Sequence, residues 1–112
     1  MMTYAQILEA QKLAHGGDTS ALEALMSEDF TWTSVSKSSL ASQSRGRSEA
    51  LEWFGSHEFD YESASAIVET PSAIVAEEVG SEKGIGRMAC MIFYRIKDGQ
   101  LAEMRHVRGD AP

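Results

Sequence analysis

His106 and Glu78 are the side chains of this 112-residue chain that best fit acid–base chemistry. An imidazole titrates near neutral pH, so His106 could give or take a proton if a carboxylate orients it. Glu78 is the candidate for that carboxylate, and a histidine bonded to a backbone carbonyl is the alternative. Tyr94 could donate a hydrogen bond to a developing oxyanion, or it could pack with its hydroxyl in water. These three residues are the candidate catalytic groups.

Cys90 and the other histidines do not form a second catalytic set. An imidazolium beside Cys90 could activate it as a nucleophile, but a small buried core thiol is the more ordinary interpretation. His15 and His57 are expected at helix ends, where a cation complements the helix dipole. The three histidines lack HxH or HxxxH spacing, so the sequence predicts no metal site and no cofactor.

The strand pattern decides which of these side chains can meet. Beyond residue 57 apolar residues alternate, with breaks at Thr70-Pro71, at residues 80–84 and at Asp98-Gly99. This pattern predicts four strands in an antiparallel meander. Because successive strand residues point to opposite faces, only one of Glu77 and Glu78 can face inward, and the pattern leaves open which one.

The turn at Asp98-Gly99 allows two registers for the last two strands. A two-residue loop would mix charged and apolar side chains on both faces. A three-residue loop, with a left-handed Gly99 in a bulge, pairs Cys90 with His106 and turns both inward. That register sends to the opposite face Arg87, Arg95, Lys97, Glu103 and Arg105. We favour it because it separates charged from apolar surface.

The first 57 residues predict three helices and one short strand. Thr3 and Gln6 form a capping-box pattern before an apolar stripe that ends at Gly16-Gly17. A shorter helix begins at Asp18 or Thr19, and a strand over 30–35 follows it. A serine-rich loop over 37–44 and a helix over about 47–56 complete this half. Helices followed by strands predict an α+β fold, with the helices on one face of a curved sheet.

Size and charge restrict the function. A chain of 12.3 kDa is predicted to be one domain, residues 1–112, with little surplus core for a large pocket. A net charge of -7, without a run of Lys or Arg, argues against nucleic acid as a partner. The sequence shows neither a membrane-length apolar segment nor a signal-peptide pattern, and it contains one cysteine. We therefore expect a soluble, cytoplasmic protein that does not bind membranes.

Three sequence segments, in this order, resemble the NTF2-like superfamily, particularly its SnoaL-like and ketosteroid-isomerase-like branches. They are GGDTSALEALMSEDFTW, GRSEALEWF and FYRIKDGQLAEMRHVR. Family members share a Gly-Asp after the first helix, a Gly-Arg at the start of the third and an Asp-Gly hairpin. The resemblance implies a cystatin-like cone, in which a curved antiparallel sheet wraps around the helices and encloses an apolar pocket. It also implies a homodimer.

A set of side chains is expected to line this pocket. They are Trp32, Ser34, Trp53, Cys90, Ile92, Met104 and Arg108. The tryptophans could contact a flat apolar ligand, or they could be ordinary core residues. Arg108 could hold a ligand carboxylate at the mouth, or it could stay in solvent.

The catalytic groups of two known branches are replaced in this chain. Ketosteroid isomerases carry a basic aspartate, an oxyanion-stabilising tyrosine and a further acid. The aligned residues here are, in that order, Ser34, Ala10 and Ile92. Limonene-type epoxide hydrolases use an Asp-Arg-Asp set. The aligned residues here are Glu78, Ala76 and His106. Neither set is complete.

Two functions from different classes therefore remain open. The first is a SnoaL-like protein that binds a small apolar ligand in the cone and acts as a cofactor-independent isomerase, hydrolase or cyclase through His106. The second is a non-catalytic ligand-binding or dimerisation domain. The outer sheet face is a candidate homodimer surface or bare solvent surface. Its charged residues are Arg87, Arg95, Glu103 and Arg105.

Overall fold

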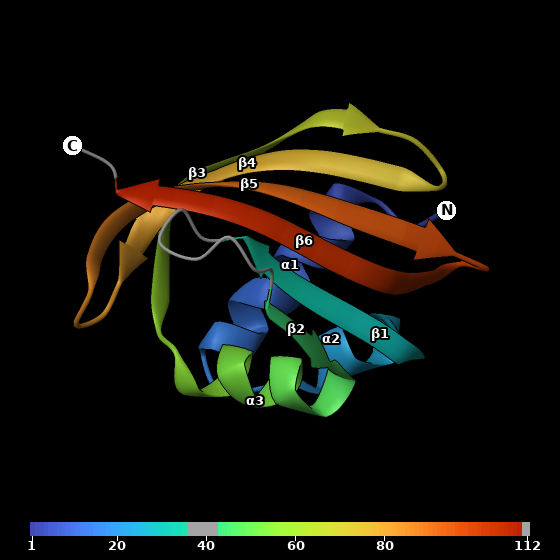
Figure 1. Cartoon of the computed structure of the whole chain (residues 1–112), viewed down its shortest axis with the longest axis horizontal. Coiled ribbons are helices and arrows are strands. Elements are labelled where there is room, and N and C mark those ends of the chain that lie inside the picture. The colour runs from blue at the N-terminus through green and yellow to red at the C-terminus, as the bar shows by residue number, and fades with distance from the viewer. Residues whose placement is uncertain (36–42, 111–112) are drawn as a thin grey trace.

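A curved, mixed sheet wraps around helices and forms a cone (Figure 1). The computed structural model describes residues 1–35 and 43–110, and these contain three helices and a six-stranded sheet. The helices are α1 (Tyr4–His15), α2 (Ser20–Leu25) and α3 (Arg47–Ser56). The strands are β1 (Met26–Val35), β2 (Gln43–Gly46), β3 (Phe59–Glu69), β4 (Ala73–Glu82), β5 (Gly86–Lys97) and β6 (Gln100–Asp110). The predicted α+β class is confirmed.

Local sequence sets both ends of α1. The Thr3 side-chain oxygen accepts a hydrogen bond from the Gln6 backbone N–H at 3.3 Å, and the Gln6 side chain accepts one from the Thr3 N–H at 2.9 Å. This is the predicted capping box. Beyond the helix, Gly17 has a φ of 103°. The buried face of α1 includes Gln11 and His15, so two polar residues lie on its apolar stripe.

The strand order is β2-β1-β6-β5-β4-β3. The pairs from β3 to β6 are all antiparallel, so the predicted meander is confirmed. The sequence did not predict that β1 lies parallel to β6. The first strand also begins earlier than expected, at Met26. Of the expected serine-rich loop, residues 37–42 lie outside the described part of the chain, and 43–44 belong to β2.

The turn between β5 and β6 shows that the predicted three-residue loop is wrong. Asp98 and Gly99 have φ values of 54° and 74°, and two successive left-handed residues are the requirement of a two-residue type I′ turn. The extra residue is Ala102, which forms a bulge in β6 where the register shifts between Arg95 and Ile96. The bulge lies beyond the turn, so the residues Asp98 and Gly99 could not predict its position.

The bulge changes the pairings but keeps the predicted faces. His106 pairs with Ile92, and Cys90 pairs with Arg108, so the expected pairing of Cys90 with His106 is wrong. Both candidate side chains still lie on the concave face. Because successive strand residues point to opposite faces, the charged residues Arg95, Glu103 and Arg105 lie on the convex face. The predicted outward position of these charged residues is therefore confirmed, although apolar residues such as Met91 and Val107 share the convex face with them.

The core fills the space between the helices and the concave face. Its largest fully buried apolar side chains are Tyr94, Phe30, Ile7, Leu22, Met26, Ile74 and Leu101. They come from helices and strands of both halves of the chain. No helix in the described part of the chain is long and apolar enough to cross a membrane.

Gly80 on β4 lies where β3 passes closest. A Cβ at this position would lie 2.3 Å from the Asp60 carbonyl oxygen and 2.6 Å from the Phe59 ring. Gly80→Ala should lower the free energy of unfolding by about 1–3 kcal/mol, because β3 must shift. Gly109→Ala on β6 is the matched control, since nothing described lies within 4 Å of its added Cβ. Urea unfolding measures the free energy of unfolding of both variants. Equal stability of the two would contradict this close approach.

Candidate functional site

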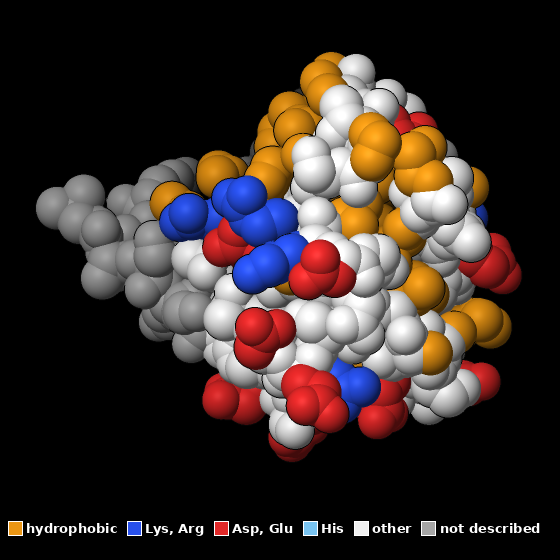
Figure 2. Space-filling view, turned by 90° about the vertical axis from the view of Figure 1, so that its right-hand side faces the viewer, with side chains coloured by type: hydrophobic (Ala, Val, Ile, Leu, Met, Phe, Trp, Pro, Cys, Tyr) orange, Lys and Arg blue, Asp and Glu red, His pale blue; other side chains and the backbone are white. Residues whose placement is uncertain are grey.

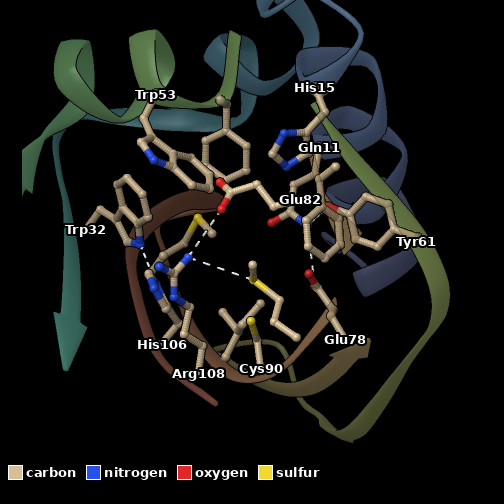
Figure 3. A pocket seen from close by; sticks show the side chains of 15 residues that line it. Gln11, His15, Trp32, Trp53, Tyr61, Glu78, Glu82, Cys90, His106 and Arg108 are labelled. Carbon is tan, nitrogen blue, oxygen red and sulfur yellow. Dashed lines mark hydrogen bonds and ion pairs between the residues drawn. The ribbon is translucent and has the colours of Figure 1, made fainter. Parts of the chain in front are cut away.

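A narrow cavity of about 50 Å³ lies between the helices and the concave face of the sheet (Figure 3). The predicted residues that line it are Trp32, Trp53, Glu78, Cys90, Ile92, Met104, His106 and Arg108. Ser34 lines a wider hollow that shares one wall with this cavity. Tyr94 is fully buried in the core behind the lining. The fold thus brings together most of the side chains that the sequence singled out.

Glu78 lies in a buried cluster of hydrogen-bond donors. Its Oε2 accepts hydrogen bonds from the hydroxyls of Tyr4 at 2.7 Å and Tyr94 at 2.8 Å. It also accepts one from Gln11 Nε2 at 3.3 Å. The side chain is 4% exposed, whereas Glu77 faces solvent, so Glu78 is the inward residue of the pair. Burial raises the pKa of Glu78, and the three donors act in the opposite direction.

The position of Tyr94 differs from both sequence interpretations. Its ring belongs to the core, but its hydroxyl is not in water. The hydroxyl can donate to Glu78 or to Gln11 Oε1, each at 2.8 Å. A tyrosine has one hydroxyl proton, so this cluster occupies it. Tyr94 therefore supports the cavity wall from behind and presents no free donor to the cavity.

His106 is held by hydrogen bonds at both ring nitrogens. Its Nδ1 accepts a hydrogen bond from Trp32 Nε1 at 2.7 Å, and its Nε2 lies 3.2 Å from Ser34 Oγ. An indole N–H can only donate, so Nδ1 carries no proton and the neutral ring is protonated at Nε2. Ser34 and His106 are direct neighbours in the parallel pairing of β1 with β6. The Trp32 indole therefore fixes the tautomer of the imidazole, and strand pairing places Ser34 beside its other nitrogen.

This environment makes His106 a weak base. Burial lowers its pKa to about 4, and the nearby charges of Arg108 and Arg45 act in the same direction. The expectation that Glu78 orients the ring is wrong, since the described hydrogen-bond partners of His106 are Trp32 and Ser34. The imidazole is neutral at pH 7.

Glu82 is the candidate that sequence reasoning missed. Its side chain is 3% exposed, and its Oε2 has no hydrogen-bond partner among the described residues. The Nη1 of Arg108 lies 3.7 Å from that oxygen. Figure 3 shows the carboxylate directed into the cavity. Strand alternation carried the signal, because residues 78, 80 and 82 share one face of β4.

The remaining polar groups of the lining come from α1 and β3. The Tyr61 hydroxyl accepts a hydrogen bond from Gln11 Nε2 at 3.3 Å. His15 donates from Nδ1 to the carbonyl oxygen of His57, and burial lowers its pKa. His15 is the last residue of α1, so its predicted place at a helix end is confirmed. Its ring lies among the aromatic side chains of the cavity, and the lowered pKa disfavours the expected cation.

Cys90 is protonated in this setting. Burial and, next, the charge of Glu78 raise its pKa to about 11. A thiol is a poor nucleophile compared with a thiolate, so the core interpretation of Cys90 is the better one. Within residues 1–35 and 43–110, no group of three His, Cys, Asp or Glu side chains is arranged to hold a metal ion.

The low pKa of His106 predicts a loss of stability in mild acid. Between about 4 and the ordinary value of 6.5, the unfolded chain binds a proton that the folded chain does not. The free energy of unfolding therefore falls as the pH drops from 6.5 to 4, with a limiting slope of about 1.4 kcal/mol per pH unit from this group.

His106→Gln should remove this part of the slope, because glutamine does not titrate and can still accept a hydrogen bond. Urea unfolding across the pH range measures the difference in stability between the two proteins. That difference should be constant above pH 7 and should shift in favour of the variant below 6.5. Parallel curves down to pH 4 would show that the ring is not held neutral.

Comparison with known proteins identifies the fold. No protein-family model matches the sequence, and no curated protein matches it either. Solved structures do match. An NTF2-like protein of unknown function from Cytophaga hutchinsonii has 11% identity and a TM-score of 0.69, over 93% of this chain and 87% of that one.

Two further solved structures carry names that suggest chemistry. A candidate isomerase from Rhodopseudomonas palustris has 16% identity and a TM-score of 0.66, over 95% of this chain and 88% of that one. A candidate polyketide cyclase from Pseudomonas putida has 18% identity and a TM-score of 0.67, over 95% and 91%. Similarity at this level of identity concerns the fold. The chain therefore has the NTF2-like fold that its sequence resemblance predicted.

Proposed function

We propose that the protein binds a small, mainly apolar ligand in the cone and moves a proton on it without a cofactor, as an isomerase or cyclase. The observation that carries this proposal is Glu82, a buried carboxylate with an unused acceptor directed into the cavity. Burial of a carboxylate oxygen that accepts no hydrogen bond costs free energy, and a general base needs an oxygen that is free to accept a proton. The proposed site of action is the cytoplasm, where the single cysteine stays reduced.

The lining residues can perform a proton transfer next to a carbonyl group. Glu82 takes a proton from the adjacent carbon, and the electron pair left there moves onto the carbonyl oxygen. The Tyr61 hydroxyl can stabilise that oxyanion, because its own proton makes no hydrogen bond with the described residues. Return of the proton to a different carbon gives an isomer. Attack of the enolate carbon on a second carbonyl closes a ring, and the new alkoxide takes the proton.

Hydrogen bonding favours Glu82 over the two groups that the sequence suggested as acid–base residues. The Oε2 of Glu78 already accepts three hydrogen bonds. The Nδ1 of His106 is occupied by Trp32, and the ring is a weak base. In this proposal Glu78 positions Gln11, which in turn holds Tyr61, and His106 positions Trp32 in the cavity wall.

The names of two matching structures, a candidate isomerase and a candidate polyketide cyclase, support the same class of reaction. Both reactions can begin with loss of a proton beside a carbonyl group.

Glu82→Gln should abolish this chemistry and preserve the fold. A suitable probe is 3-cyclohexenone, a small β,γ-unsaturated ketone whose conversion to the conjugated isomer raises its ultraviolet absorbance. The variant should lower kcat/KM at least about 100-fold, the usual contribution of a positioned base. Glu77→Gln, on the solvent side of the same strand, should keep wild-type activity. A Glu82→Gln protein as active as wild type would refute the assignment of the base.

One observation favours the non-catalytic alternative. The cavity measures about 50 Å³, whereas sites for drug-sized ligands usually occupy about 300–1,000 Å³. A thermal-shift screen distinguishes the two functions, because any bound ligand raises Tm by mass action. The panel contains small apolar acids, sterols, terpenoids and polyketide-like aromatics. Binding without turnover supports the alternative function.

We also propose that a second copy of the chain covers the convex face of the sheet. Val68, Val75 and Phe93 are cross-strand neighbours there, and Met91 lies beside Val107 in the next row. Val68, Met91 and Val107 are 48%, 44% and 55% exposed. Figure 2 shows hydrophobic side chains along the upper part of the molecule, beside a group of Lys and Arg. A patch of this kind is typical of an interface between identical subunits.

Charge substitutions in this patch should dissociate the dimer. Met91→Glu or Val107→Glu would place a carboxylate on each side of a two-fold interface, so sedimentation velocity should show monomers. Ile85→Glu is the control, since Ile85 is 62% exposed in the turn between β4 and β5. Its sedimentation should match that of the wild-type dimer. A monomeric wild-type protein would contradict the proposal.

A further inference from the structure

A hollow of about 200 Å³ lies at the mouth of the cone, next to the narrow cavity. Its lining residues are Trp32, Ser34, Arg45, Trp53, His106 and Arg108. Trp32, Trp53, His106 and Arg108 also line the cavity, so the two spaces share a wall. The proposed function uses the cavity and leaves this hollow without a role.

Strand register explains why two arginines meet at this mouth. Arg45 on β2 is the direct neighbour of Trp32 on β1, and directly opposed residues share a face of the sheet. Arg108 follows His106 by two residues on β6, so it also faces inward. Segments more than sixty residues apart in sequence thus place two guanidinium groups around one hollow.

The positive charge of this hollow is only partly compensated. No ion pair involves Arg45 within the described part of the chain, and its guanidinium lies 5.4 Å from the centre of the Trp32 ring. Arg108 has a distant partner, the Glu82 carboxylate at 3.7 Å, and its side chain is 45% exposed. In a chain with a net charge of -7, this is a local concentration of positive charge.

The aromatic rings beside the arginines add an angled apolar wall. The ring centres of Trp32 and Trp53 lie 4.7 Å apart, with an angle of 58° between the planes. Hydrogen bonding to His106 fixes the Trp32 ring. Guanidinium groups bind carboxylates through paired N–H donors, and aromatic faces bind planar apolar groups.

We propose that this hollow binds a small aromatic or conjugated carboxylate. The carboxylate lies between Arg45 and Arg108, and the planar body lies against Trp53 and points toward the cavity. This inference rests on the proposed function, since it names the substrate class for the same cone. It assigns recognition of the substrate to the mouth and proton transfer to Glu82.

Binding of benzoate tests the proposal, with benzamide as the neutral control of nearly the same shape. Isothermal titration calorimetry gives both affinities. Quenching of tryptophan fluorescence reports the location, because both tryptophans of the chain line the hollow. Benzoate should bind at least about tenfold more tightly than benzamide, as expected for a charge-assisted hydrogen-bonded pair. Equal affinities, or no detectable benzoate binding, would overturn the proposal.

Single substitutions locate the site. Arg45→Gln should weaken benzoate at least about tenfold and leave benzamide nearly unchanged, and Arg45→Lys should restore part of the loss. Arg108→Gln should act in the same way. It also removes the cation beside Glu82, so Arg45→Gln is the variant that decides. Arg105→Gln, on the convex face of the same strand as Arg108, changes the net charge equally and should bind like wild type. An unchanged affinity in Arg45→Gln would refute the site.

The two proposals can fail separately. Tight benzoate binding that requires Arg45, together with full activity of Glu82→Gln, would support the anion site and reject the proposed base. Turnover of 3-cyclohexenone that requires Glu82, without preference for benzoate over benzamide, would support the proposed base and reject the anion site.

Discussion

The Glu78 carboxylate, buried inside the cone, is the interaction on which the rest of the site depends. A carboxylate that is 4% exposed must be hydrogen-bonded or protonated, because desolvation disfavours its charge. Here the donors come from different elements: Tyr4 and Gln11 from α1, and Tyr94 from β5. The carboxylate therefore ties the first helix to β4 and β5, and it does so at the wall of the cavity.

Glu82 lies four residues further along the same face of β4, in a contrasting environment. Glu78 has hydrogen-bond donors around it, whereas Glu82 has an acceptor that no described donor satisfies and one distant arginine. In the proposed function, Glu78 has the structural role and Glu82 the chemical one. Burial of a carboxylate oxygen without a hydrogen bond is tolerable at Glu82 because the hydrogen bonds at Glu78 stabilise the fold around it.

Local patterns predicted the elements but not the contacts between them. Capping residues predicted α1, and alternation predicted the last four strands and one inward glutamate at 77 or 78; the structure shows that it is Glu78. His106 was predicted to face inward, yet its partners depend on the parallel pairing of β1 with β6, between residues 72 apart. The alternation of apolar residues along a strand does not determine which distant strand it pairs with. Glu82 was missed for a different reason: the glycines at 80 and 84 indicated a break in the strand, whereas β4 continues through Gly80 to Glu82.

The bulge at Ala102 shifts the pairing of the last strand by one residue and so reverses which of its side chains face inward. In an unbroken ladder after the two-residue turn, residues 103, 105 and 107 would face the interior, and His106 and Arg108 would face out. One backbone irregularity therefore decides which of two side-chain sets the cone encloses. Deletion of residue 102 would keep His106 and Arg108 inside, because a regular hairpin without that residue forms the same pairs with β5. The chemistry of β6 is thus encoded by the number of residues between the turn and Met104, as much as by their identity.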